Sequence, residues 1–438
     1  MTPLPTSRPD GKDPLRRLVE ECFHREAGLS APLPADDVDL IESGILDSMG
    51  WVSFLRTIES ASGVGELGSD LNDRAASFAA ILAALQTGGS RASGATRDVS
   101  PRPISKNGVP AIIPGSSAAV GSRIVPSEEV DRAFGMPPGK LRGRAGIESL
   151  AYAAEGENEL TLGARAAQEA LRAASCGAQQ LDWIIATSET HHDYPSLSAQ
   201  LHSRLLLRED CGALDVGGAC LGLLHAFAVA ESLIRSGQAQ TAAVVTADVH
   251  SRTLTPARVA GEFGGLFGDG ASAFLLRRAD SADQGYQLGD FLFGCAGQYA
   301  AAIQVNDTRE GGLDVKFDGE ALSRAAITRL EKVLAAVELR SGIPRDSVGS
   351  FATHQPNPRL VALLAKQCAV SPKKFPPIAR TYGNLGSSTC GAALHAALQD
   401  DSNRRQPIFL ASLGPGLLFG GGWLTPSDWT HTSALRSV

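Results

Sequence analysis

Cys220 and Ser48 are the two side chains whose surroundings favour covalent chemistry. Cys220 follows a strand-like run, 213–216, and three small residues, and it opens the apolar stretch 221–235, which has helical spacing. A thiol at a helix start lies in the positive end of the helix dipole, which predicts a lowered pKa. The same turn offers the Cys220 N–H to an oxyanion. We therefore expect a nucleophile, although a lone cysteine among apolar residues is more often only packed.

Ser48 follows Asp47 at the predicted start of a helix that carries apolar residues through Ile58. A hydroxyl at this place is exposed, and the N–H groups and dipole of the helix start favour a phosphate ester. The simpler interpretation is that Asp47 and Ser48 only cap the helix. The predicted chemistry at Ser48 thus depends on the segment around it.

That segment is acidic. Residues 1–88 hold 7 Lys and Arg against 14 Asp and Glu, whereas the remaining chain holds 33 of each sign. This division favours a small acidic module attached to a neutral body, and it argues against nucleic acid as a partner. No apolar run could span a bilayer or act as a signal core, so we expect no membrane partner and a cytoplasmic location. Seven cysteines without CxxC spacing predict neither disulfides nor a metal site.

Helical spacing in the acidic module predicts helices after Asp13, from Ser48, and over 78–85, which together form a small helical bundle. Residues 86–108 are rich in Gly, Ser, Arg and Pro and are predicted to be a flexible linker with a reach of roughly 25 Å. From Pro110 onward apolar runs of strand length alternate with helical segments, which indicates an α/β body. The predicted strands include 111–113, 183–186, 242–246, 273–276, 350–352 and 408–411.

The acidic module resembles the acyl carrier proteins. Its motif Glu42-Ser43-Gly44-Ile45-Leu46-Asp47-Ser48-Met49-Gly50 is similar to their attachment site, and most similar to carriers of the D-alanyl type. The resemblance covers residues 13–86 and implies an all-α four-helix carrier bundle. It also implies a 4′-phosphopantetheine cofactor on Ser48, attached by a phosphopantetheinyl transferase.

The body resembles β-ketoacyl-acyl carrier protein synthase III, of the thiolase superfamily. The motifs are Cys220 with its glycines, His354-Gln355-Pro356-Asn357, Tyr382-Gly383-Asn384-Leu385-Gly386-Ser387-Ser388, Phe267-Gly268-Asp269-Gly270-Ala271 and Gly414-Pro415-Gly416. The resemblance implies a five-layer α/β/α/β/α fold of two similar halves and a homodimer. The expected domains are the carrier at 1–86, the linker at 87–109, and two ketosynthase halves at 110–285 and 286–430.

The resemblance also implies a mechanism. Cys220 takes an acyl group from a thioester, with its own N–H and that of Gly416 as the oxyanion hole. His354 and Asn384 then stabilise the enolate left when a malonyl-type thioester loses CO₂. Arg359 matches a basic residue that docks the carrier, and Tyr194 a residue that caps the partner subunit's acyl tunnel. The expected function is decarboxylative Claisen condensation in polyketide or specialised fatty-acyl biosynthesis, with acyl and malonyl thioesters and other carrier proteins or synthase modules as partners.

Three departures leave alternatives open. Residues 140–147 lack the aromatic residue that stacks coenzyme A in the family, so a carrier-bound donor is an alternative to coenzyme A. In the late glycine-rich loop, Pro415 replaces a glycine. Glu189 also resembles the general base of hydroxymethylglutaryl-CoA synthase, which condenses without decarboxylation, although the other motifs favour a glutamate that faces solvent or a neighbouring subunit. Acyl transfer from Cys220 to a hydroxyl, amine or carrier thiol is a further alternative, and so is a silent interaction subunit.

Overall fold

The computed structural model describes residues 13–28, 31–64, 67, 71, 76–87, 108–259, 261–280, 285–289, 291–308, 311–403 and 405–429. The chain forms two compact units, one built mainly from Met1–Ile104 and one from Ser105–Asp318 and Ala325–Val438. Most of the predicted linker lies outside the described residues. No helix in the described ranges is long and apolar enough to cross a membrane.

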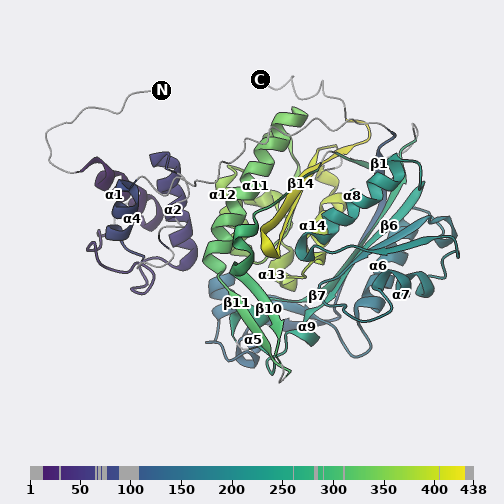
Figure 1. Cartoon of the computed structure of the whole chain (residues 1–438), viewed down its shortest axis with the longest axis horizontal. Helices are drawn as coiled ribbons and strands as arrows, with labels where there is room; N and C mark the ends of the chain where they lie inside the picture. The colour runs from purple at the N-terminus through teal and green to yellow at the C-terminus, as the bar shows by residue number, and fades with distance from the viewer. Residues whose placement is uncertain are drawn as a thin grey trace. The chain divides into compact units, whose positions relative to one another are not determined.

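The small unit contains three described helices, drawn in purple in Figure 1. They are α1 (Pro14–Ala27), α2 (Ser48–Ser62) and α4 (Phe78–Gln86). Both predicted helix starts are confirmed, because Asp13 accepts a hydrogen bond from Leu15 N at 3.0 Å and Asp47 accepts one from Gly50 N at 2.8 Å. A fourth helix stays a prediction, since parts of the segment between α2 and α4 lie outside the described residues.

An aromatic cluster joins these helices. Phe23 meets Phe54 and Phe78 edge to face, with ring centroids 5.9 and 5.3 Å apart, and all three side chains are fully buried. The hydrophobic core around them draws only on residues between Val19 and Leu85. The small unit therefore has a hydrophobic core of its own.

The large unit is built on one mixed ten-stranded sheet, in the order β12-β13-β14-β8-β1-β7-β6-β4-β5 with β9 beside β14. Its strands are β1 (Ala111–Val120), β4 (Trp183–Thr187), β5 (Gly212–Asp215), β6 (Thr241–Val249), β7 (Asp269–Arg278), β8 (Tyr286–Leu288), β9 (Leu292–Cys295), β12 (Ser350–Thr353), β13 (Ile408–Gly414) and β14 (Leu418–Pro426). Every predicted strand of the body is present, and most extend further than the apolar run that predicted them.

The two ends of this sheet follow one pattern. β4 runs parallel to β6, β7 is antiparallel to β6, and β1 is antiparallel to β7. In the same way β12 runs parallel to β13, β14 is antiparallel to β13, and β8 is antiparallel to β14. The body is thus two similar half-sheets joined where β1 meets β8.

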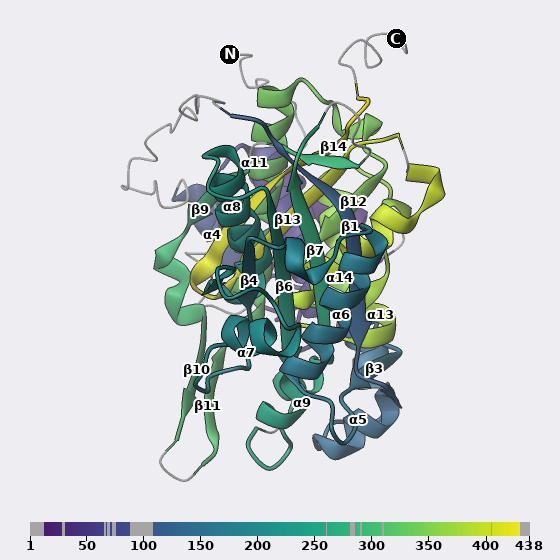
Figure 2. The same ribbon diagram turned by 90° about the vertical axis from the view of Figure 1, so that its right-hand side faces the viewer.

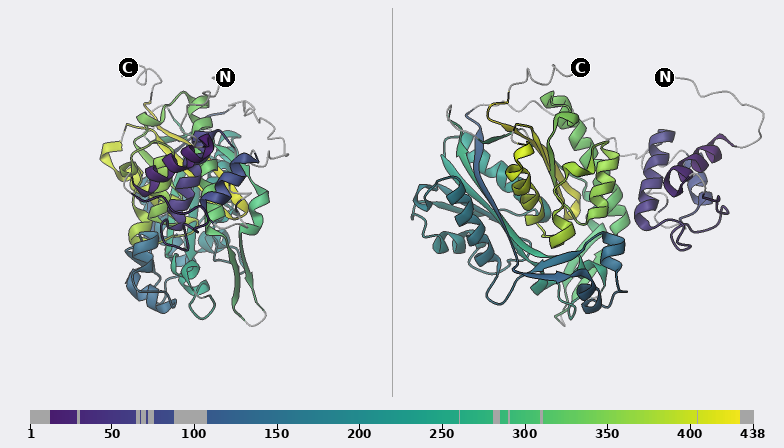
Figure 3. Two further views of the ribbon diagram at one scale, coloured as in Figure 1. Left: turned by 90° about the vertical axis from the view of Figure 1, so that its left-hand side faces the viewer. Right: turned by 180° about the vertical axis from the view of Figure 1, so that it is seen from behind.

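Helices cover both half-sheets (Figures 1 and 2). They are α5 (Ser127–Ala133), α6 (Glu159–Ala173), α7 (Leu197–Arg204), α8 (Gly222–Arg235), α9 (His250–Thr253), α10 (Glu262–Gly265), α11 (Gly319–Ser341), α12 (Pro358–Gln367), α13 (Ile378–Tyr382) and α14 (Ser388–Gln399). α8 and α14 share one core with strands of both half-sheets, whereas α6 with α7, and α11 with α12, form separate outer cores. The body therefore has five layers, α/β/α/β/α, which the rear view in Figure 3 also displays.

Two short hairpins extend from these layers, one formed by β2 (Arg123–Pro126) with β3 (Ser149–Tyr152) and one by β10 (Ile303–Asp307) with β11 (Leu313–Phe317). A smaller core under the first hairpin holds the segment Leu141–Ala145 in place. The second hairpin is mostly exposed.

We expect Phe54→Ala to destabilise the small unit by about 3–5 kcal/mol, because it leaves a cavity in a core that contains no residue of the body. Calorimetry of the whole chain should show the transition of the small unit lowered or lost while that of the large unit stays unchanged. Phe54→Leu, which retains most of the volume, is the control and should shift the same transition less. An equal shift in both transitions would contradict separate cores.

Candidate active site

The register of β4 and β6 brings Glu189 and Asp248 together. These parallel strands pair Trp183 with Ala242 and Thr187 with Thr246, so the residues that follow leave the sheet at the same carboxyl edge. Asp248 Oδ1 accepts a hydrogen bond from the Glu189 N–H at 2.5 Å. The loop after β4 is thereby fixed onto the end of β6.

Cys220 is held over the same edge by a tight turn. It lies in the 3-10 turn Ala219–Leu221, and α8 begins at Gly222, one residue later than predicted. Ala219 has a φ of 47°, a left-handed conformation that is uncommon outside glycine. A Cβ on Gly222 would collide with Thr187 Oγ1, so α8 starts directly against the end of β4.

The second half-sheet supplies His354 and Asn384. His354 follows β12, and its N–H donates to Ala411 O on β13 at 3.0 Å. Asn384 is buried, and its Oδ1 accepts hydrogen bonds from Gly386 N at 3.1 Å and Thr389 Oγ1 at 3.0 Å. Because the Gly386 N–H can only donate, the amide orientation is determined and its NH₂ group faces the opposite side.

The late glycine loop connects the second half to the Cys220 turn. Ser412 Oγ donates to Cys220 O at 2.5 Å. A Cβ on Gly414 would lie 2.7 Å from Gly218 O, so the two loops touch through their backbones. Gly416 follows with a φ of 75°. The structure thus brings the turn of Cys220 and the loop of Gly416 together.

The predicted lowering of the Cys220 pKa is wrong. Burial, the charge of Glu189 and its hydrogen bond with the thiol, and the charge of Asp248 together raise the pKa of Cys220 well above its ordinary value. The dipole of α8 is outweighed chiefly by burial, and the charges of Glu189 and Asp248 act in the same direction as burial. Cys220 therefore rests as a thiol at neutral pH.

Glu189 does not face solvent, contrary to one of the two simpler interpretations of this residue. Its side chain is 14% exposed, lies within hydrogen-bonding reach of the Cys220 thiol, and pairs with His250 through Oε2 and Nε2 at 3.5 Å. His250 is buried and lies against the Phe267 ring, with centroids 4.5 Å apart. Asp248 Oδ2 accepts a hydrogen bond from Ser387 Oγ at 2.6 Å. A cluster of two carboxylates and one imidazole thus lies beside the thiol.

Charges within this cluster shift each pKa. Burial raises that of Glu189, but the hydrogen bond and charge of His250 outweigh burial and lower it. Burial and the charge of Glu189 raise the pKa of Asp248 to about 7. Burial lowers the pKa of His250, but the hydrogen bond and charge of Glu189, with the charges of Asp248 and Asp269, raise it to about 9. At neutral pH His250 is therefore cationic.

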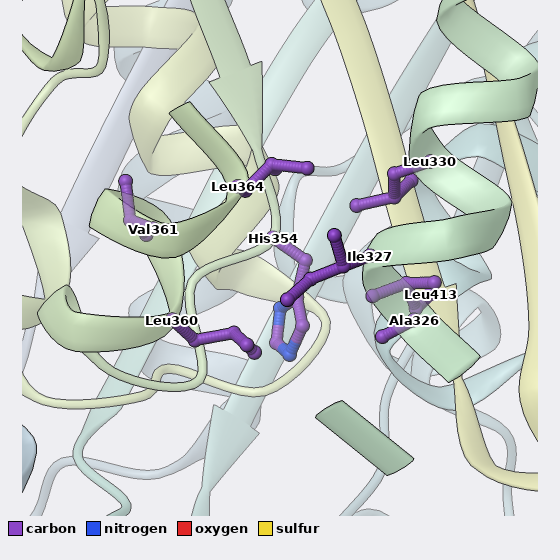
Figure 4. A pocket seen from close by; sticks show the side chains of 8 residues that line it. All are labelled: Ala326, Ile327, Leu330, His354, Leu360, Val361, Leu364 and Leu413. Atoms are coloured by element: carbon purple, nitrogen blue, oxygen red, sulfur yellow. The ribbon is translucent and has the colours of Figure 1, made fainter. Parts of the chain in front are cut away.

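His354 is in the opposite state. Burial lowers its pKa to about 4, so its ring is neutral at physiological pH. The ring lies among apolar side chains of α11, α12 and β13 that line a pocket (Figure 4): Ala326, Ile327, Leu330, Leu360, Val361, Leu364 and Leu413. The neutral imidazole therefore lies in apolar surroundings.

Three other predicted residues lie elsewhere. Ser48 is the first residue of α2, but its side chain is outside the described part of the chain. Arg359, on α12, donates to Gly143 O at 2.5 Å. Tyr194 is 98% exposed on the loop before α7. None of the three is part of the Cys220 cluster as described.

Comparison with known proteins identifies the family. Models described as 3-oxoacyl-[acyl-carrier-protein (ACP)] synthase III and as its C terminal part match residues 214–297 and 339–425. The β-ketoacyl-[acyl-carrier-protein] synthase III of Haemophilus ducreyi is 32% identical over 284 residues, which cover 64% of this chain and 86% of that protein. The chain belongs to the β-ketoacyl-acyl carrier protein synthase III family. As predicted, it is an enzyme of the thiolase superfamily, an acyltransferase of the condensing type.

Solved structures agree on the fold of this synthase III. The synthase III of Aquifex aeolicus has a TM-score of 0.65 at 24% identity and covers 72% of this chain and 99% of its own. The priming β-ketosynthase of the R1128 polyketide pathway has a TM-score of 0.67 at 22% identity and covers 74% of this chain and 98% of its own. Xanthomonas campestris OleA has a TM-score of 0.65 at 19% identity and covers 72% of this chain and 98% of its own. The thiolase-like α/β fold is thereby confirmed.

Asp248 and His250 were missed by sequence reasoning. Both follow the apolar run 242–246, and Asp248 and His250 are two residues apart, the spacing that places side chains on one face of a strand. Charged residues at the carboxyl end of a buried strand are a recognised sign of a site. The signal was present, but pairing it with Glu189 required the register of β4 and β6.

We expect His250 to make the stability of the synthase III depend on pH above neutrality. Its pKa rises from 6.5 in the unfolded chain to about 9 in the native state, so its stabilisation is complete below pH 6.5 and is lost as the pH rises through 9. The free energy of unfolding should fall by up to about 3 kcal/mol across this window. Urea denaturation at several pH values should show a smaller fall in His250→Gln, and an equal slope would contradict the charged state.

Proposed function

We propose that this protein catalyses decarboxylative Claisen condensation between an acyl group on Cys220 and a malonyl-type thioester, in polyketide or specialised fatty-acyl biosynthesis. The observation that supports the proposal is that Cys220 and His354 both lie in the field of Glu189, while Asn384 bonds Gly386, which lies against His250 and Asp248 of the same cluster. In the first step Cys220 attacks a thioester and keeps its acyl group. The N–H groups of Cys220 and Gly416 hold the oxyanion formed there.

Decarboxylation follows at His354 and Asn384. A neutral imidazole and an amide NH₂ group are donors that stabilise an enolate without first protonating the carboxylate that must leave. Support comes from the low pKa of His354 and from the fixed orientation of the Asn384 amide. The enolate carbon attacks the acyl carbonyl on Cys220, the C–S bond breaks, and a β-ketoacyl thioester is released.

We further propose that the small unit is a carrier domain with 4′-phosphopantetheine on Ser48. The backbone at this place suits the group, since Ser48 opens the 15-residue helix α2, whose first-turn N–H groups and dipole favour a phosphate ester. When attached, the group supplies a terminal thiol that bears an acyl thioester. The α2 start would present it at the surface of the unit, with a phosphopantetheinyl transferase as the partner that installs it.

The pocket beside His354 supports a dry reaction site. Its lining of Leu, Ile and Val would exclude water from the enolate. The thioester that reaches this site is carried either by coenzyme A or by a carrier protein. We propose that Arg359 docks a carrier. Tyr194, almost fully exposed, is proposed to cap the tunnel of the partner in a homodimer.

Non-decarboxylative condensation is a second candidate, favoured by the contact between Glu189 and Cys220. A carboxylate at the thiol could remove a proton from the carbon next to the acyl carbonyl, which makes CO₂ loss unnecessary. Acyl transfer from Cys220 to another nucleophile is the simpler third candidate. Release of CO₂ distinguishes the decarboxylative condensation from both, and the presence of a condensation product distinguishes these two from each other.

We expect Cys220→Ala to abolish acylation, and His354→Ala and Asn384→Ala to acylate normally but to condense about 100-fold more slowly or worse, because each removes an enolate donor. Peptide mass spectrometry of Cys220 after hexanoyl-N-acetylcysteamine, followed by malonyl-N-acetylcysteamine with CO₂ collection, measures both steps. Product without CO₂ would favour the Glu189 reaction. Acyl transfer without a β-ketoacyl product would favour the transferase.

A matched control for these histidine and asparagine variants is His202→Ala. His202 lies on α7, where Nε2 bonds the backbone of Arg208 in the outer layer. Both steps should proceed in this variant as in the wild type. Failure of the wild type to acylate Cys220 with any thioester would overturn the proposal.

We expect a phosphopantetheinyl transferase with coenzyme A to add one phosphopantetheine group to the whole chain and none to Ser48→Ala. Ser43→Ala, in the same motif, should be modified like the wild type. Intact-protein mass spectrometry measures the addition. An unmodified wild type, or a modified Ser48→Ala, would contradict the carrier assignment without affecting the chemistry at Cys220.

A further inference from the structure

We propose that the Glu189 carboxylate takes the proton of the Cys220 thiol when the enzyme is acylated, and that His250 and Asp248 are positioning residues that hold Glu189 for this step. The inference deepens the proposed function and rests on it, because it concerns how Cys220 becomes a nucleophile. It holds for either kind of condensation, since both begin with acylation.

Contacts at the thiol support a carboxylate as the proton acceptor. Glu189 acts on the Cys220 thiol by its charge and by hydrogen bonding. Its Oε1 is buried and has no conventional hydrogen bond among the described residues, whereas Oε2 faces His250 at 3.5 Å. One oxygen is thus fixed by a cation and the other is available to the thiol.

Contacts of the Glu189 backbone and of its neighbours His250 and Asp248 position this carboxylate. The Glu189 N–H is bonded to Asp248 Oδ1 at 2.5 Å, which fixes its backbone. Phe267 lies against the His250 ring, and a Cβ on Gly386 would lie 2.4 Å from His250 Cε1 and 2.9 Å from Asp248 Oδ2. The glycine at this position therefore allows the imidazole and Asp248 to occupy the space beside Glu189.

His354 is a poor acceptor for the same proton. Its ring is buried among apolar side chains, which disfavour the imidazolium that proton transfer would create. Protonation of Glu189 instead neutralises a negative charge that lies near a second carboxylate, Asp248. Transfer to Glu189 therefore creates no new buried cation, whereas transfer to His354 would create one.

The acylation step balances within these groups. The S–H bond of Cys220 breaks and an O–H bond forms on Glu189 while the sulfur attacks the thioester carbonyl. The tetrahedral intermediate collapses, its C–S bond to the leaving group breaks, and the departing thiolate takes the proton from Glu189. Cys220 ends acylated, Glu189 ends ionised, and a free thiol is released.

Ionisable groups reach the cluster from every element around it. They are Glu189 after β4, Asp248 and His250 at the end of β6, Asp269 on β7, Cys220 before α8 and His354 after β12. Asp269 also accepts from Ser251 N at 2.9 Å, which fixes the backbone next to His250. The charge near the thiol is therefore set by Glu189, Asp248 and the His250 imidazolium, with Asp269 acting on His250.

The test compares two reactions of Cys220 in Glu189→Gln. Alkylation by iodoacetamide needs only the thiolate, and because the charge of Glu189 raises the thiol pKa, its removal should speed alkylation severalfold at pH 7. Acylation by hexanoyl-N-acetylcysteamine needs the proton acceptor and should slow about 100-fold. Opposite changes in the two rates are expected, and a merely structural role cannot produce them.

Glu338→Gln is the matched control, because it removes a partly buried carboxylate that pairs with Arg345 on the same body. Both rates should equal those of the wild type. Acylation of Glu189→Gln at the wild-type rate would overturn the inference, as would a parallel fall in both rates. A wild type that is never acylated would instead defeat the proposed function, and the inference with it.

His250→Gln tests the positioning role. Without the imidazolium, the buried Glu189 should bind its proton more tightly, so the acidic limb of the pH–rate profile of acylation should move to higher pH. The alkylation rate at high pH, where the thiol ionises unaided, should stay near that of the wild type. An unmoved acidic limb would assign His250 a packing role only.

Discussion

The parallel pairing of β4 with β6, and of β12 with β13, is the constraint on which the site depends. The two strands of each pair end side by side at the same edge of the sheet. The residues that follow them therefore leave the sheet close together. Glu189 and Asp248 come from the first pair, and His354 from the second. α8 and α14 lie between the half-sheets in a single core, which brings these two edges to one place. If these strands paired in another register, Glu189, Asp248 and His354 would no longer lie close together, even if every helix formed.

Burial at this place gives two histidines opposite charges. His250 faces carboxylates, and their fields exceed the cost of desolvating its cation, whereas His354 faces apolar side chains and remains neutral. A neutral donor suits an enolate formed by loss of CO₂, and a cation suits the anchoring of a carboxylate. One residue type thus serves two tasks because its neighbours differ.

Much of this could be read from the sequence, and the rest could not for physical reasons. The strands, the helix starts at Asp13 and Asp47, and the motifs of Cys220, His354 and Asn384 depend on local pattern, which the sequence carries directly. The pKa of Cys220 depends on Glu189, 31 positions earlier, and on Asp248, 28 positions later. Local reasoning included the helix dipole but not these two charges, and so it predicted the wrong direction.

A thiol that rests protonated has a consequence for how its donor arrives. Such a thiol reacts slowly with stray electrophiles, because only the thiolate attacks. The protonated state of the thiol also slows acylation by a dilute thioester. Fast acylation then requires that both the proton acceptor and the thioester lie near Cys220. If the arm proposed on Ser48 bears the donor, the sequence of about 20 residues that connects it to the body predicts a roughly millimolar effective concentration of that donor. A protected nucleophile and a donor carried on the same chain would then compensate for each other.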